Sequence, residues 1–173
     1  MAIVFDTETT GLIENRTLRL DRQPYVTEFY GCEIDLDTGE VRREVQRLCK
    51  VPIKLEAKIT KITGIDNAML ENENPFDPEI IDFLESGEMI VAHNLSFDKD
   101  MIEIEAQRLE RKVAWPIGIC TVEQTIGMKG HRLSLSMLHK ELFGEEFAGS
   151  HRARVDVEAL CRCCVELRKR EMI

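Results

Sequence analysis

The sequence lacks any apolar run approaching the roughly 20 residues that a membrane-spanning helix needs. Its first ten residues, MAIVFDTETT, also lack the basic segment and long apolar stretch of a secretory leader. Six cysteines are present, but apart from a single C-x-x-C they show neither a disulfide framework nor a zinc-site spacing. We therefore expect a soluble cytoplasmic protein, with no membrane partner and with reduced, structural thiols.

Positive charge is also scarce. The chain has 23 Lys and Arg against 32 Asp and Glu, which gives a formal net charge of −9. Because phosphate contacts normally come from Lys and Arg, this balance argues against a broad surface for duplex nucleic acid. It does not exclude a phosphate-binding site built from carboxylates, because bound divalent cations neutralise such a site locally.

The size and apolar content of the chain predict one domain. At 173 residues with 43% apolar content, the chain can bury one substantial core but is short for two ordinary domains. We therefore predict a single domain over residues 1–173.

Apolar periodicity predicts strands and helices in a mixed order. We expect strands over 2–5, 25–34, 41–51, 89–92 and 117–122, and helices over 52–64, 75–87, 96–109, 133–143 and 150–168. Ser96 is the expected cap of the third helix. An early hairpin followed by alternating helices and strands indicates an α/β fold with a mixed sheet. In such sheets, functional sites gather at strand ends beside helix N-termini.

Two carboxylates follow the first predicted strand. Asp6 and Glu8 are two residues apart on an extended segment, so their side chains leave the same face, with Cα atoms roughly 6.6 Å apart. They can share one metal ion. A helix-capping or surface pair is the alternative, but unpaired carboxylates at the end of a buried strand would be costly. This setting favours a metal site.

Three further candidates lie near predicted helix starts. Asp98 falls in the first turn of the helix after strand 89–92, where the helix dipole favours an anion. His151 and Asp156 are five residues apart near the start of the last helix, a separation that does not form a zinc pair on one helical face. Taken alone, Asp98 also fits an ordinary helix-start acid, and the His151/Asp156 spacing also fits chance.

Together these segments resemble the DEDDh (DnaQ-like) 3′–5′ exonucleases, which include polymerase proofreading epsilon subunits and stand-alone 3′ repair exonucleases. Residues 5–12 (FDTETTGL) are similar to the family's first motif, residues 92–98 (AHNLSFD) to its second and residues 151–156 (HRARVD) to its third. The likeness extends over nearly the whole chain. It implies a ribonuclease H-like fold, with a mixed five-stranded sheet flanked by helices, and a single exonuclease domain.

The resemblance also implies a mechanism. Four carboxylates without consistent soft ligands favour two Mg²⁺ ions, with Mn²⁺ as substitute. By resemblance, Asp6 bridges both ions, Glu8 and Asp156 complete the first site, and Asp98 supports the second. His151 is the expected general base for the attacking water, and the product is a nucleoside 5′-monophosphate.

The expected substrate contacts fall in two of the motifs. Thr7, Thr9 and Leu12 are the candidates for holding the last nucleotide, and His93, Asn94 and Phe97 are those for lining the path of the next one. Core packing fits Leu12 and Phe97 equally well. Aromatic residues make up only 6% of the chain, so few bases can stack on the protein, and the bound strand should be short.

The expected partner is a nucleic acid with a 3′ end, with DNA favoured over RNA on motif likeness. Trimming of RNA is one alternative. A catalytically silent polymerase accessory or binding module is another, but all five site residues are retained, and nothing structural demands four converging carboxylates. A polymerase or replication partner and the oligomeric state stay open.

Overall fold

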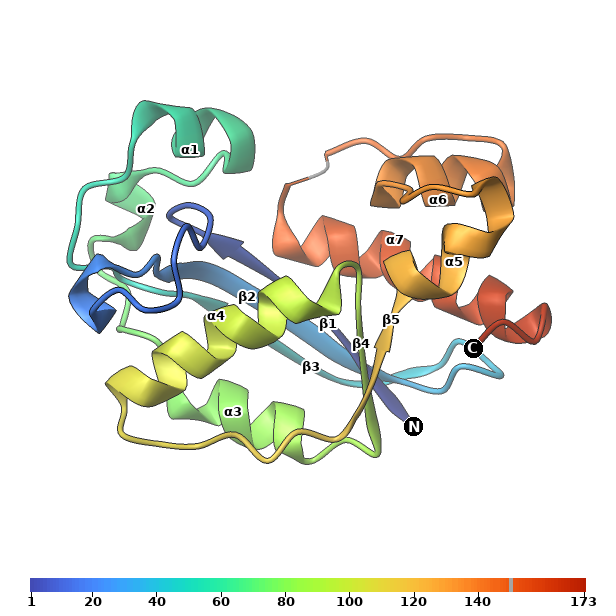
Figure 1. Cartoon of the computed structure of the whole chain (residues 1–173), viewed down its shortest axis with the longest axis horizontal. Coiled ribbons are helices and arrows are strands. Elements are labelled where there is room, and N and C mark those ends of the chain that lie inside the picture. Colours follow the sequence, from blue (N-terminus) through green and yellow to red (C-terminus); the bar gives the residue numbers. More distant parts are fainter. Residues whose placement is uncertain (150) are drawn as a thin grey trace.

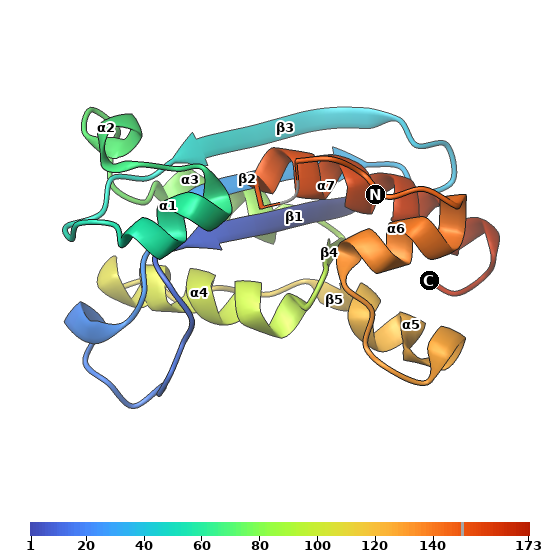
Figure 2. The same ribbon diagram turned by 90° about the horizontal axis from the view of Figure 1, so that it is seen from above.

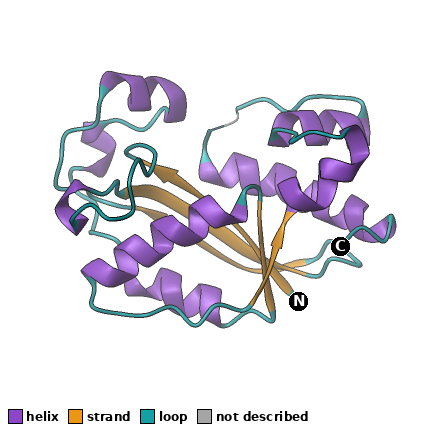
Figure 3. Ribbon diagram, viewed as in Figure 1, coloured by secondary structure: helices purple, strands orange, loops and turns teal. Residues whose placement is uncertain are grey.

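The computed structural model describes residues 1–149 and 151–173, and these form one mixed sheet flanked by helices (Figures 1 and 3). The sheet has five strands in the order β3-β2-β1-β4-β5. These are β1 (Ala2–Thr9), β2 (Val26–Ile34), β3 (Val41–Leu48), β4 (Met89–Ala92) and β5 (Ile117–Cys120). The first three strands pair antiparallel, whereas β4 pairs parallel with both β1 and β5. The predicted mixed five-stranded sheet is confirmed.

Helices cover both faces of this sheet. The α helices are α1 (Ala57–Thr63), α2 (Asn67–Leu70), α3 (Pro78–Glu85), α4 (Leu95–Arg108), α5 (Thr121–Lys129), α6 (Leu135–Phe143) and α7 (Ala153–Lys169), with a short 3-10 helix η1 (Leu20–Arg22). Helices α3 and α4 pack on one face and α7 on the other, with α6 against α7 (Figures 1 and 2). Among the described residues, no helix is long and apolar enough to cross a bilayer.

Strand β1 lies at the centre of the core because both of its faces are buried. Ile3 and Phe5 pack toward α3 and α4, whereas Ala2 and Val4 pack toward α7. Burial on both faces explains why the run is continuously apolar rather than alternating. The same alternation continues along the strand. The side chains of Asp6 and Glu8 therefore point to the side of the sheet that α7 covers, and that of Thr7 points to the side that α4 covers.

The first strand extends further than the predicted end at Phe5. Its polar residues continue the ladder with β2, pairing Asp6 with Tyr30 and Glu8 with Glu28, and the strand ends at Thr9. Backbone pairing with β2, rather than side-chain polarity, sets where this strand ends.

Several helix boundaries also differ from prediction. Ser96 lies inside α4, and the cap position is Asn94, whose φ of 77° is left-handed and suits Asn better than most residues. Strand β5 stops at Cys120, and the unpredicted helix α5 begins at Thr121. The predicted start of the last helix at Ser150 lies outside the described residues, and α7 begins at Ala153.

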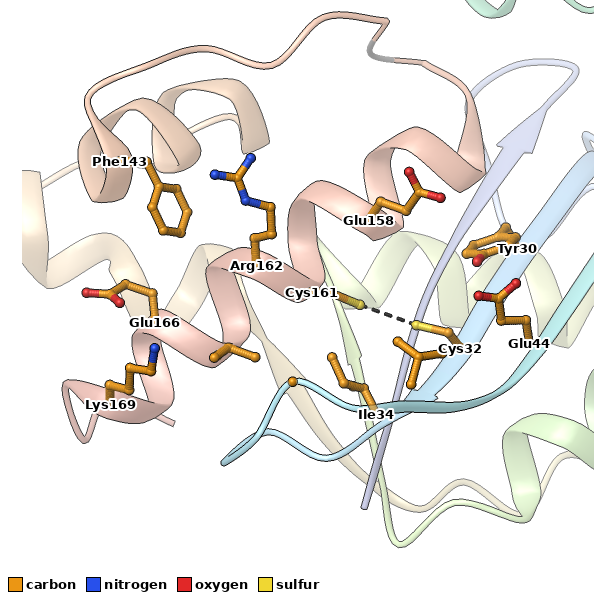
Figure 4. Close-up of a pocket in the computed structure, with 13 residues that line it drawn as sticks. Tyr30, Cys32, Ile34, Glu44, Phe143, Glu158, Cys161, Arg162, Glu166 and Lys169 are labelled. Atoms are coloured by element: carbon orange, nitrogen blue, oxygen red, sulfur yellow. Dashed lines mark hydrogen bonds between the residues drawn. The ribbon is translucent and has the colours of Figure 1, made fainter.

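A cavity of about 500 Å³ lies between α7 and the strands β2 and β3 (Figure 4). The Sγ atoms of Cys32 and Cys161 approach to 3.3 Å beside it. All six cysteines are buried and free, which agrees with the expected reduced, structural thiols.

Candidate active site

Three elements bring acidic side chains to the carboxyl end of β1. Asp6 and Glu8 lie on the strand itself, Asp98 lies in the first turn of α4, and Asp156 lies in the first turn of α7. Helix α4 follows directly after β4, which runs parallel to β1, so its N-terminus meets the same edge of the sheet. The structure thus brings together the four carboxylates that the sequence singled out.

Asp98 is held in place by Thr7. Its Oδ1 atom accepts hydrogen bonds from the Thr7 backbone N at 3.1 Å and from the Thr7 hydroxyl at 2.7 Å. Asp98 is only 2% exposed, so these bonds replace contacts with water. Both hydrogen-bond donors of Thr7 are engaged by Asp98, so Thr7 orients this carboxylate. Thr7 also belongs to the lining of the cleft beside Glu8.

His151, which is exposed, lies close to Glu8 and Asp156. One ligand atom from each of these residues lies within 4.8 Å of those from the other two. His151 has a left-handed φ of 70°, and its backbone N donates to Asp156 Oδ2 at 2.9 Å. This bond ties the loop that carries His151 to the first turn of α7.

The donor set fits a divalent cation. Asp156 Oδ1 is buried and has no hydrogen-bond partner among the described residues, although a buried carboxylate oxygen normally has one. Carboxylate oxygens are the ligands that Mg²⁺ and Mn²⁺ prefer. The unsatisfied oxygen, in a cluster of four acids, suits a bound cation.

Burial raises the pKa of every acid in the cluster, and repulsion from the neighbouring carboxylates adds to the increase for Asp6 and Glu8. Burial, then Asp98 and the other neighbouring carboxylates, raises the pKa of Asp6 well above its ordinary value. Burial, then Asp156 and other acids, raises the pKa of Glu8 to about 8. Burial raises the pKa of Asp98 to about 7 against the opposing hydrogen bonds from Thr7, and burial also raises the pKa of Asp156. Full ionisation at neutral pH therefore needs a counter-charge.

The raised pKa values predict how stability depends on pH. Folding raises the pKa of Glu8 from 4.5 to about 8 and that of Asp98 from 3.8 to about 7, so the folded state binds protons more tightly. This contribution is fully present below the unfolded pKa values and is lost as pH rises through the folded ones. In chelator, the free energy of unfolding should therefore fall between about pH 4 and about pH 8.

Urea unfolding across this range, in EDTA and in excess Mn²⁺, checks the pH dependence. Saturating Mn²⁺ should remove most of the fall, because the bound cation favours the ionised carboxylates. A metal-free protein whose unfolding free energy rises over the same range would contradict the assignment of a strained acidic cluster.

Thr7→Val tests the positioning of Asp98. We expect the rate of the exonuclease activity that the resemblance implies to fall about tenfold, because the substitution keeps the shape of the side chain but removes the hydroxyl that orients Asp98. Thr27→Val is the matched control on β2, because the Thr27 hydroxyl is buried without a partner among the described residues. Single-turnover rates at saturating metal measure both variants. Equal rates for the two variants would remove the proposed role of Thr7.

A cleft of about 710 Å³ opens beside Glu8, between the loop that follows β1 and helix α1. The lining includes four of the predicted substrate contacts, Thr7, Thr9, Leu12 and Phe97. Leu12 is 77% exposed at this cleft, so it is not a core residue. Phe97 both lines the cleft and packs against the core. The Thr9 hydroxyl donates to the Gly11 carbonyl at 2.8 Å, which shapes the loop.

His93 and Asn94 are not brought to the described lining of this cleft. His93 Nε2 lies 3.0 Å from the Leu133 carbonyl and Nδ1 lies 2.9 Å from the Thr121 hydroxyl, so both ring nitrogens have partners within the protein. Asn94 Oδ1 accepts from Arg132 at 2.7 Å. These two residues form the connection between β4 and α4, and their hydrogen bonds hold it against Thr121, Arg132 and Leu133.

Sequence reasoning missed one charged pair at the site. Glu28 lies on β2 directly opposite Glu8, is completely buried and is paired with Arg152. The available signal was a carboxylate between apolar residues in the middle of a predicted strand, where a buried ion needs a partner.

Comparison with known proteins agrees with this geometry. The RNase_T family model, described as Exonuclease, matches residues 3–163. The chain is 26% identical over 167 residues to the 3′–5′ exonuclease DinG of Bacillus subtilis, covering 90% of this chain and 16% of that protein. It is 29% identical over 163 residues to the PolC-type DNA polymerase III of Staphylococcus aureus, covering 91% of this chain and 10% of that protein. The chain thus spans only a small part of these relatives.

Solved structures share the fold. Exonuclease X in complex with 5′ overhanging duplex DNA aligns with a TM-score of 0.71 at 21% identity, covering 98% of this chain and 92% of that one. The nuclease domain of 3′hExo, a DEDDh family member bound to rAMP, aligns with a TM-score of 0.78 at 16% identity and the same coverage. The family-model match covers nearly the whole chain and contains all five candidate site residues. The expected membership of an exonuclease family is confirmed, and the chain belongs to the RNase_T family of exonucleases.

Proposed function

We propose that this chain is a divalent-metal-dependent 3′–5′ exonuclease that hydrolyses the last phosphodiester bond of a DNA strand and releases a nucleoside 5′-monophosphate. The observation that carries this proposal is the convergence of four carboxylates and His151 from three separate elements beside an open cleft. Buried, mutually repelling acids are costly to a fold unless they serve a cation.

Asp6, Glu8, Asp98 and Asp156 would hold two Mg²⁺ ions, with Mn²⁺ as substitute and Asp6 shared between them. When bound, such ions stabilise the charge on the attacking and leaving oxygens of an in-line displacement at phosphorus. The four carboxylates would hold these ions, and with them the reacting phosphate, at the end of β1. Thr7 keeps Asp98 in its orientation through two hydrogen bonds.

His151 would take the proton from the attacking water. Imidazole is the side chain that most often serves as a general base in such proton transfers. Its backbone N is held by Asp156, and its ring nitrogen is close to the carboxylates of Glu8 and Asp156. The leaving group is the 3′ oxygen of the shortened strand.

The cleft would bind the terminal nucleotide. Its lining includes Thr9 at the end of β1, Leu12 from the loop that follows, Ile62 and Thr63 from α1, and Phe97 from α4. Its volume of about 710 Å³ is within the range of small-molecule sites. This size favours a short single-stranded end, in keeping with the few aromatic residues of the chain.

DNA is the proposed substrate because the relatives that match about nine tenths of the chain include PolC-type DNA polymerases as well as the exonuclease DinG. The same relatives make a polymerase or another replication protein the proposed partner. Trimming of RNA is the competing activity, since discrimination depends on contacts to the 2′ position of the sugar.

Matched single strands of DNA and RNA, labelled at the 5′ end, test the activity and the sugar preference together. Each is incubated with Mg²⁺, Mn²⁺ or EDTA. We expect a ladder of shortening 5′-labelled fragments from DNA that disappears in EDTA. A ladder from RNA alone would assign the RNA activity. Two intact substrates in the presence of metal would support the silent accessory module instead.

A further inference from the structure

A fifth carboxylate lies at the edge of the site. Glu28 on β2 pairs directly with Glu8 on β1 and is completely buried. In an antiparallel pair, opposite residues point to the same face with Cα atoms ~4.5–5.5 Å apart. Glu28 therefore shares the face from which Asp6 and Glu8 approach the proposed metal ions.

Arg152 neutralises this carboxylate. Its Nε donates to Glu28 Oε2 and its Nη2 to Oε1, both at 2.9 Å, and Ala153 N adds a third bond to Oε2 at 3.2 Å. The arrangement is the bidentate fork that makes Arg–carboxylate pairs strong and directional. Arg152 stands directly after His151 and caps α7, four residues before Asp156.

The pair acts electrostatically on the cluster. Glu28 is among the groups that raise the pKa of Asp6, Glu8 and Asp156, whereas Arg152 lowers the pKa of Glu8. Removing the guanidinium would leave a buried anion beside four other acids. Removing the carboxylate would leave a cation beside them.

We propose that Arg152 is a positioning residue that neutralises Glu28, so that this fifth carboxylate adds no charge to the metal site and does not act as a surplus ligand. The inference rests on the proposed function. It assigns to Arg152 a role that depends on Glu28 rather than on direct contact with the nucleic acid.

The charge of the Arg152–Glu28 pair predicts the order of Mn²⁺ affinities among variants. Relative to the neutral wild-type pair, Arg152→Met adds one negative charge to the site and Glu28→Gln adds one positive charge. The double variant is neutral again. Mn²⁺ affinity should rise at least about threefold in Arg152→Met, fall at least about threefold in Glu28→Gln, and return to within about twofold of wild type in the double variant. Arg152→Lys, which keeps the charge, should bind Mn²⁺ like wild type.

The catalytic rate and the Mn²⁺ affinity should change in opposite directions in Arg152→Met. Arg152→Met should lower kcat at least about tenfold despite its tighter Mn²⁺ binding, because an unpaired Glu28 draws cations away from their working positions. Adding Glu28→Gln should recover most of this loss. A residue that only anchors the loop would not be rescued, because the anchor is missing in both variants.

Calorimetric titration of the metal-free full chain with Mn²⁺, in the absence of nucleic acid, measures the affinities, and the 5′-labelled DNA assay measures turnover. Arg168→Met is the matched control, because it removes an exposed pair with Asp37 from the far end of α7. Thermal unfolding of each variant verifies that it is folded.

A double variant as slow as Arg152→Met, or one whose Mn²⁺ affinity does not return toward that of wild type, overturns the inference. The titration does not depend on catalysis. An inactive wild type would refute the proposed function, and the predicted order of Mn²⁺ affinities among the variants could still be measured. Active wild type with equal Mn²⁺ affinities in all variants would refute this inference alone.

Discussion

Asp6→Asn is expected to lower the exonuclease rate by about three orders of magnitude or more, because Asp6 is the proposed ligand shared by both cations. The same substitution should stabilise the metal-free protein. Asp6 lies among Glu8, Asp98 and Asp156, and burial with these neighbours raises its pKa well above the ordinary value. A neutral amide removes that repulsion, so the free energy of unfolding in EDTA near pH 8 should rise by about 1 kcal/mol or more.

Urea unfolding in EDTA and single-turnover rates in Mn²⁺ measure the two effects of Asp6→Asn. Asp82→Asn is the matched control, because Asp82 is an exposed acid of α3 whose one ion-pair partner among the described residues is Arg111. The control should keep its rate and change stability by under about 1 kcal/mol. An Asp6→Asn variant that is active, or one that is less stable than wild type without metal, would contradict the account of the cluster.

His151→Ala is expected to lower the rate by about two to four orders of magnitude while Mn²⁺ binding stays close to that of wild type. The imidazole is proposed to accept the proton of the attacking water, and the four carboxylates that would hold the cations are untouched. Added imidazole should restore part of the rate, since a free base can occupy the space that the side chain leaves.

Calorimetric titration distinguishes this role from metal ligation. His151 lies close enough to Glu8 and Asp156 to complete a three-residue ligand set. A His151→Ala variant that loses Mn²⁺ affinity in proportion to its rate, and that imidazole does not rescue, would make His151 a ligand rather than a base.

The sequence correctly predicted that Asp6 and Glu8 share one face of β1, but it did not predict where that strand ends. Asp6 and Glu8 lie on one face because extended backbone alternates every second residue, and this holds although the strand runs on to Thr9. Asp98 and Asp156 were correctly placed near helix starts. That all four meet at one point is a tertiary property, and only the resemblance to a family of known arrangement predicted it.

Other features depend on packing that local patterns do not encode. Thr7 leaves the opposite face of β1 from Asp6, so its bonds to Asp98 exist only because α4 packs on that face. The change from strand to helix at Thr121 lies within one apolar segment, where periodicity cannot separate the two. His93 lies in the second motif, where a substrate contact was expected, yet its two ring nitrogens are within hydrogen-bond distance of the Thr121 hydroxyl and the Leu133 carbonyl.

Hydrolysis of single-stranded DNA in ¹⁸O-labelled water, followed by mass spectrometry of the released products, tests the central claim most directly. Attack by water on the last phosphodiester bond predicts nucleoside 5′-monophosphates that carry one ¹⁸O atom, in the presence of Mg²⁺ or Mn²⁺ and not in EDTA. Release of oligonucleotides from internal cleavage, of 3′-monophosphates, or of no product with metal present would contradict it.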